Sequence, residues 1–212
     1  MGIQCGIFAV LFQKWYNASP RYYSDLPFIL ALSSVILIYN HIDSILGVTG
    51  IMPITDISQL INLIGMLTMI CLNLVIMLII YLPDRKKLRT GFLIGWFSMW
   101  IAILTVLIST IGVSEVFHTI IFMMSLPIML LLTITWFFCH FKKRLSVINP
   151  LLVGIAFTLW FISIILRIFI TSIGTPIGHY EDVFTDLHWI AGFMDIATFT
   201  IMLLGFSREV KH

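Results

Sequence analysis

Two ionisable residues interrupt long apolar stretches of the chain and are the first candidates for chemistry. Arg167 lies in the apolar stretch 151–173, and Asp195 lies in the stretch 187–206. An unpaired ionisable side chain inside a bilayer costs about 2.5 to 3.5 kcal/mol on insertion scales, so such a residue usually has a partner or a function. If both stretches cross a membrane as helices, Arg167 lies roughly 9 Å and Asp195 roughly 12 Å below the same membrane face.

We therefore predict an intramembrane ion pair between Arg167 and Asp195. Consecutive spans usually lie side by side, and the two depths nearly match. Such a pair could fix the packing of two helices, or it could act as a relay for protons or anions. The residue types leave both interpretations open.

A second group of candidates combines histidines and carboxylates near one end of the apolar stretches. Its members are His41, Asp43, Glu115, His118 and His188. Glu115 and His118 have the i, i+3 spacing of carboxylate-bridged di-metal sites in helix bundles, although those sites use two such pairs. Neutral imidazole suits copper and zinc, whereas carboxylates suit harder ions. The group predicts either a bound metal ion or a solvated acidic rim.

Haem is a further possibility for His41, His118 and His188, because haem-ligating histidines lie at one depth on facing helices. All three fall near the outer ends of their stretches, which would suit a single b-type haem in the outer leaflet. The alternative is that they are interfacial histidines that form hydrogen bonds. We expect no cofactor, with a bound metal ion or an outer-leaflet haem as the alternatives.

Several functional classes find no support in the sequence. It contains no P-loop, dinucleotide fingerprint, kinase signature or nucleophile elbow. The net charge of only +2 does not indicate nucleic-acid binding. The spacing of the cysteines fits neither a disulfide framework nor a zinc site; they are Cys5, Cys71 and Cys139. We expect neither nucleotide nor nucleic acid as a partner, and a chain that is not an enzyme.

Composition predicts the elements that position these residues. The chain has 212 residues, of which 60% are hydrophobic and only 10% charged, against about 25% charged in typical soluble domains. A membrane span needs about 20 mostly apolar residues. Six runs qualify: 27–48, 59–82, 91–113, 116–139, 151–173 and 187–206. We expect an all-α fold, a polytopic transmembrane helix bundle that forms a single domain over residues 1–212.

Two local features refine this topology. Residues 1–12 are apolar without the basic start of a signal peptide, which predicts a short interfacial or partly inserted helix. The alternative is a truncated seventh span, since twelve residues of helix reach only about 18 Å. Pro127 lies inside the fourth run, and we expect it to kink that helix.

The cations predict the orientation, because short cytoplasmic loops carry the excess of Lys and Arg. All but Arg167 fall on one side of the predicted topology: Lys14, Arg21, Arg85, Lys86, Lys87, Arg89, Lys142, Lys143, Arg144, Arg208 and Lys211. The opposite side gathers the acids Asp43, Asp56, Glu115, Glu181, Asp182 and Asp186. We expect a multi-pass protein of the cell membrane with both termini in the cytoplasm and a long outer loop over residues 171–186.

Three stretches carry a resemblance to known proteins. They are Arg21 to Leu30, Arg144 to Pro150 and Leu166 to Phe169, and they resemble poorly characterised archaeal multi-span membrane proteins. Some of those proteins are similar to the membrane input bundles of sensor kinases. The resemblance implies a helical bundle that works either as a stand-alone sensing unit or as a subunit recruited to a larger membrane assembly.

These observations favour one function over several others. We expect a non-catalytic accessory or structural subunit of a larger membrane protein complex, with membrane lipids and other integral membrane subunits as partners. The alternatives are a stand-alone membrane sensor module, a metal- or haem-dependent redox protein that uses the outer His and carboxylate cluster, and a small transporter.

Overall fold

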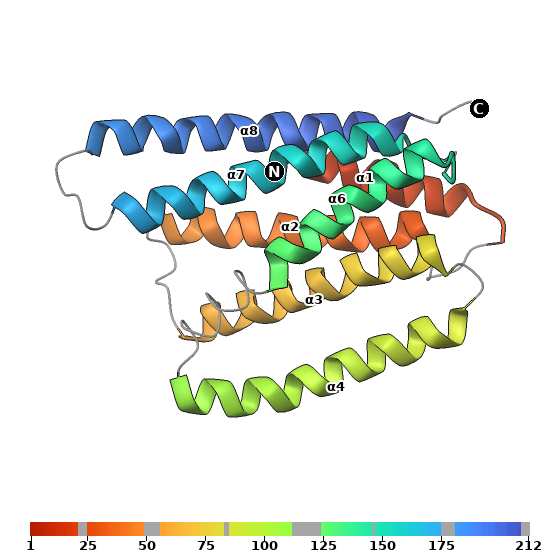
Figure 1. Ribbon diagram of the computed structural model, residues 1–212, viewed down its shortest axis with the longest axis horizontal. Coiled ribbons are helices and arrows are strands. Elements are labelled where there is room, and N and C mark those ends of the chain that lie inside the picture. Colours follow the sequence, from red (N-terminus) through yellow and green to blue (C-terminus); the bar gives the residue numbers. More distant parts are fainter. Residues whose placement is uncertain are drawn as a thin grey trace. The chain divides into compact units, whose positions relative to one another are not determined.

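A computed structural model of the chain is helical throughout the part that it describes (Figure 1). The residues described are 1–20, 25–48, 56–82, 85–111, 124–145, 147–174 and 181–208. Within these ranges no residue lies in a strand, which confirms the predicted all-α class. A long apolar chain favours helices because each helix satisfies its backbone hydrogen bonds within its own segment.

Seven helices lie within the described ranges. They are α1 Gly2–Asn17, α2 Leu26–Val48, α3 Asp56–Tyr81, α4 Lys86–Ile111, α6 Leu126–Phe141, α7 Pro150–Gly174 and α8 Glu181–Ser207. The chain divides into two compact units, Met1–Ile128 and Met129–His212. That residues 1–212 form a single domain stays a prediction.

The helices follow the predicted runs, and two of them begin earlier than predicted; residues 116–123 of the fourth run lie outside the described part of the chain. The helix α4 begins at Lys86 and α8 begins at Glu181, so both extend into segments that we expected to be loops. Most of the predicted outer loop 171–186 is therefore wrong, because its first residues belong to α7 and its last ones to α8. Hydropathy predicts where an apolar run ends, but a helix can continue beyond that point. Lysine and glutamate are good helix formers, so α4 and α8 include charged residues that hydropathy assigned to loops.

Three helical segments are long and apolar enough to cross a membrane. They are Leu60–Tyr81, Pro150–Ile170 and Trp189–Ser207. Three shorter apolar segments coincide with the other predicted runs: Leu26–Tyr39, Ile94–Thr110 and Leu126–Phe141. The described residues therefore contain three full-length candidate spans, where six were predicted, and their length and composition fit a membrane-embedded protein.

In the unit Met1–Ile128 each helix packs on the next, α1 on α2, α2 on α3 and α3 on α4. The N-terminal helix is longer than predicted, and its buried residues Gln4, Ile7 and Leu11 lie on one face. The ring centroids of Trp15 on α1 and Phe28 on α2 are 4.8 Å apart. The short N-terminal helix is thus packed against α2 along its length. Whether it enters the membrane stays a prediction.

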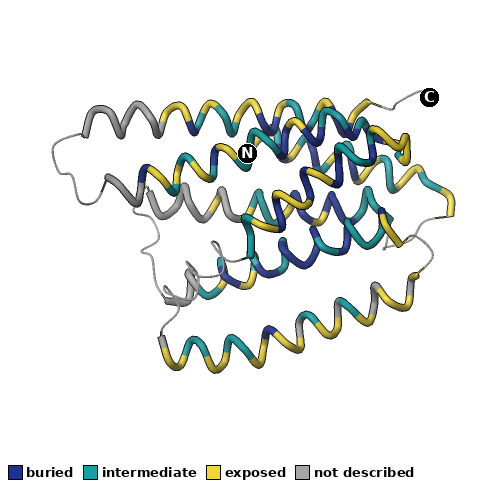
Figure 2. The backbone as a smooth tube through the Cα atoms, in the orientation of Figure 1, coloured by how far each residue is buried: buried dark blue, intermediate teal, exposed yellow. Residues whose placement is uncertain are grey.

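The helices α3 and α4 share a hydrophobic core to which Ile128, at the start of α6, also contributes. Its buried members are Leu63, Leu67, Ile70, Trp100 and Ile128. Trp96, Ile103 and Leu107 of α4 are partly buried against the same cluster. One face of α4 therefore lies against α3, while Figure 2 shows exposed residues recurring along the rest of the helix.

In the unit Met129–His212, α6 packs against α7. The ring centroids of Trp136 and Phe157 are 6.3 Å apart, and a Cβ at Gly154 would lie 3.4 Å from the Phe137 ring. Pro127 is the second residue of α6, and a π-helical turn at Met124 and Ser125 directly precedes that helix. A proline and a π-helical turn each interrupt the regular backbone hydrogen bonds of an α-helix. The direction of the predicted helix before this turn depends on residues 112–123, which lie outside the described part of the chain, so the kink at Pro127 stays a prediction.

The helix α7 begins with a well-defined cap. The backbone N–H of Leu152 donates to Asn149 Oδ1 at 3.3 Å, and Pro150 follows Asn149 as the first helical residue. This is the arrangement expected of an N-cap asparagine followed by proline. The backbone N–H of Asn149 also donates to the carbonyl oxygen of Gly205 at 2.8 Å, which ties the start of α7 to the end of α8.

The helices α7 and α8 run antiparallel along their length (Figure 1). A Cβ at Gly205 would lie 2.9 Å from Val153 Cγ2, and the rings of Trp160 and Phe199 are 5.9 Å apart. Positions of α7 that touch α8 fall on one face of the helix, and their partners on α8 follow in reverse order. This α7–α8 interface positions Arg167 and Asp195 opposite each other.

Candidate functional site

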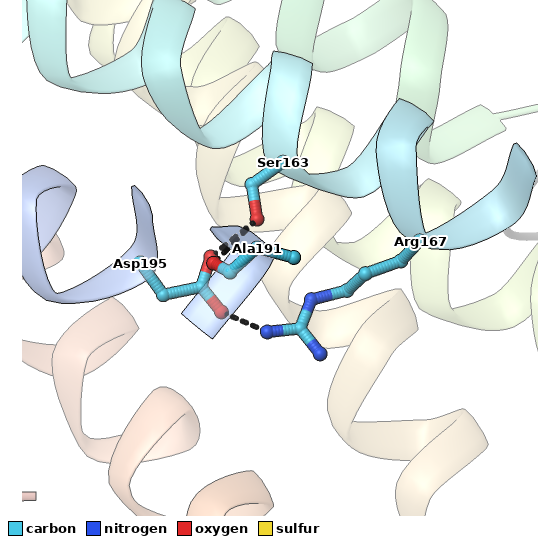
Figure 3. Close-up of polar contacts among 4 residues, drawn as sticks. All are labelled: Ser163, Arg167, Ala191 and Asp195. Carbon is cyan, nitrogen blue, oxygen red and sulfur yellow. Dashed lines mark hydrogen bonds and ion pairs between the residues drawn. The ribbon is translucent and has the colours of Figure 1, made fainter. Parts of the chain in front are cut away.

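Arg167 and Asp195 form an ion pair between α7 and α8, as predicted. Arg167 Nη2 lies 2.5 Å from Asp195 Oδ2 (Figure 3). The antiparallel pairing of α7 and α8 brings the two residues together. The prediction that these two residues are partners is therefore confirmed.

Ser163 adds a contact that the sequence analysis missed. Its hydroxyl donates to Asp195 Oδ1 at 2.7 Å and lies 3.3 Å from the carbonyl oxygen of Ala191 (Figure 3). Ser163 stands one helical turn before Arg167, so both side chains project from the same face of α7. The i, i+4 spacing of a serine and an arginine was the available signal in the sequence.

The three side chains differ in exposure in a way that suits a membrane. Ser163 is fully buried, whereas the side chains of Asp195 and Arg167 are 23% and 44% exposed. A long arginine side chain can keep its charged end toward a membrane interface while its stem covers apolar surface. The carboxylate thus accepts a hydrogen bond on one oxygen and is neutralised by a cation at the other. An isolated charge is avoided within the span.

The surroundings of this pair bear on what it can do. Between Pro150 and Ile170, and between Trp189 and Ser207, Arg167 and Asp195 are the only ionisable residues. A proton relay needs a chain of titratable groups through which protons pass, and these two spans supply a single neutralised pair. The arrangement fits a packing element that sets the register of α7 on α8.

The predicted metal ligands lie outside what the structure describes. Glu115 and His118 belong to residues 112–123. His41 and Asp43 lie on α2 and His188 lies on α8, but their own side chains are outside what the structure describes. Among the residues that are described, no group of three or more His, Cys, Asp and Glu could hold a metal ion. The metal site and the outer-leaflet haem both stay predictions.

A second feature that the sequence analysis missed is a face of small residues on α4. Its members are Gly91, Gly95, Ser98, Ala102, Thr105 and Ser109, and all are exposed. They recur at alternating spacings of four and three residues, which places them along one side of the helix. A Cβ built at Gly91 or Gly95 would meet no atom within 4 Å. We call these six residues the small-residue face.

Comparisons with protein-family models, with curated proteins and with solved structures find no match to this chain. The resemblance to archaeal multi-span proteins and sensor input bundles therefore stays a prediction.

Proposed function

We propose that this chain is a non-catalytic integral membrane protein with six spans and cytoplasmic termini, and that it serves as an accessory or structural subunit of a larger membrane complex. It would act by binding a transmembrane helix of another subunit. The small-residue face of α4 is the observation that carries this proposal, because a helix of that kind is suited to pairing within a bilayer.

The two sides of α4 differ in what they contact. Trp96, Trp100 and Ile103 pack into the core shared with α3, whereas the small-residue face is exposed. Two of the three hydroxyl groups on that face bond within their own helix: Thr105 Oγ1 donates to the carbonyl of Ile101 at 2.8 Å, and Ser109 Oγ donates to that of Val106 at 2.7 Å. These two hydroxyls therefore require no partner on another helix, and the small side chains allow another backbone to approach closely.

Membrane physics explains why such a face favours a protein partner. Lipid tails are as apolar as leucine, so helices associate through close packing, and small residues allow it. The pairing of α7 with α8 in this chain follows the same rule, since Gly205 lies directly against Val153 and Ala191 is fully buried. The small-residue face on α4 repeats this chemistry without a described partner helix.

Charge favours a different chain over a second copy as the partner. In a six-span topology every copy of α4 has the same orientation, so two copies would pair in parallel. Parallel pairing would bring Lys86, Lys87 and Arg89 at one helix end close to the same residues of the other copy, and like charges repel. A partner helix with small residues on its contact face and few cations at this end would avoid that cost.

The proposal can be tested by enlarging one residue of the face. Gly95→Leu should release the partner when the chain is purified in mild detergent and co-purifying subunits are identified by mass spectrometry. Gly192→Leu on α8 is the matched control, because a Cβ there also meets nothing within 4 Å. Loss of the same subunit in both variants, or in neither, would contradict the proposal. A wild-type chain that purifies without any other subunit would contradict it too.

A further inference from the structure

The end of α6 gathers cations in a part of the chain without acids. Lys142, Lys143 and Arg144 follow the last residue of α6, and all three are exposed. No Asp or Glu occurs anywhere in residues 116–180. We call these three cations the basic rim of the unit Met129–His212.

The backbone at the end of α6 is held in a defined conformation. Arg144 N–H donates to the carbonyl of Cys139 at 3.1 Å, and Lys143 N–H donates to that of His140 at 3.2 Å. Lys143 has a φ of 51°, the left-handed conformation of a Schellman cap. Because backbone N–H groups cap these carbonyls, the lysine ammonium groups are not needed as caps.

Two aromatic residues accompany the cations. The guanidinium carbon of Arg144 lies 5.2 Å from the centroid of the Phe138 ring, a cation–π contact that orients the arginine. Phe141 is the most exposed large apolar side chain among those described, at 77%, and it directly precedes Lys142. A cationic cluster beside a projecting aromatic ring is suited to a ligand that is anionic at one end and apolar at the other.

We propose that the basic rim binds the headgroup of an anionic phospholipid, with Phe141 against its acyl chain. Clusters of Lys and Arg next to a membrane span attract anionic headgroups, while zwitterionic ones offer little net attraction. An inorganic phosphate would meet the same cations but would leave Phe141 without a partner. The inference rests on the proposed membrane placement and does not depend on a partner helix for α4.

The test measures lipid binding by the purified full chain in neutral detergent. Phosphatidylglycerol should bind and raise the thermal midpoint, whereas phosphatidylcholine and inorganic phosphate should not. Lys142→Gln with Lys143→Gln should weaken phosphatidylglycerol binding about thirtyfold. The matched control is Lys86→Gln with Lys87→Gln, an equal charge change at the start of α4, which should bind as the wild type does.

A further variant separates lost lipid binding from damage to the fold. Lys143→Gly removes one cation while it favours the left-handed backbone at that position. It should therefore raise the thermal midpoint without lipid and still weaken phosphatidylglycerol binding. Equal weakening in the two double variants would mean that net charge alone acts, and binding that is unchanged by Lys143→Gly, or reproduced by inorganic phosphate, would also overturn the proposal.

Discussion

The hydroxyl of Ser163 donates to one carboxylate oxygen of Asp195, the oxygen that Arg167 does not bind. One turn of α7 thus occupies both oxygens of an acid on α8. An antiparallel helix pair can slide by a turn without losing apolar contact, because one apolar side chain resembles another. A polar triad can form in a single register only, so it specifies how α7 lies on α8.

The ion pair should appear as a coupling energy in a double-mutant cycle. Asp195→Asn and Arg167→Gln should each destabilise the chain, because each leaves one charge without its partner. The double variant should lose less than the sum of the two, with a coupling of about 1 to 3 kcal/mol. Unfolding in mixed micelles by titration with sodium dodecyl sulfate measures all four proteins. Strict additivity would show that the contact contributes nothing to stability.

Ser163→Ala should destabilise the chain by about 1 to 2 kcal/mol, because it removes a hydrogen bond to a charged group in a buried position. Thr158→Val on the same helix is the control, since the Thr158 hydroxyl donates to the carbonyl of Gly154 within α7. The control should change the free energy of unfolding little. A Ser163→Ala chain as stable as the control would mean that Arg167 alone holds Asp195.

Gly205→Ala tests the close approach of the two helices. The added Cβ would lie 2.9 Å from Val153 Cγ2 and 3.1 Å from the Val153 backbone nitrogen, so one helix must move. We expect a loss of about 1 to 3 kcal/mol, the usual range for overpacking. Gly192→Ala meets nothing within 4 Å and should be neutral or slightly stabilising, because alanine favours helix. Equal stability of both variants would contradict the observed packing.

Hydropathy and charge predicted most of the fold and the ion pair. The apolar runs located the helices because a bilayer requires long apolar segments, and depth counting paired Arg167 with Asp195. Faces were harder to predict. In a membrane helix the lipid side is as apolar as the packed side, so hydropathy does not distinguish the face of α4 that contains Trp100 from the face that contains Gly95. Residue size carries that information.

Ser163 was missed for a related reason. A serine inside an apolar run can bond to its own helix, as Ser33 does with the carbonyl of Ile29 at 3.0 Å, and sequence alone does not separate this from a contact to a neighbouring helix. Counting residues along the two apolar runs predicts that Asp195 lies at the level of Arg167, but it does not predict the rotation of α7. Only the packing of α7 on α8 determines which side chains reach the acid.

Thr198 gives the last prediction, because its hydroxyl behaves unlike those of its neighbours. Thr133, Thr158 and Thr200 each donate to a carbonyl four residues earlier. The Thr198 hydroxyl is fully buried and has no hydrogen-bond partner among the described residues. A buried hydroxyl without a partner costs about 1 to 3 kcal/mol.

Thr198→Val replaces that hydroxyl by a methyl group of similar size, so it should raise the free energy of unfolding by about 1 kcal/mol. The same change at Thr200, which is exposed and bonded to the carbonyl of Ile196, should give no gain. Both variants are compared by detergent titration under the conditions used for the ion pair. If Thr198→Val destabilises the chain, its hydroxyl has a partner that stabilises α8, and the ion-pair cycle repeated in that variant would show whether Asp195 is coupled to it.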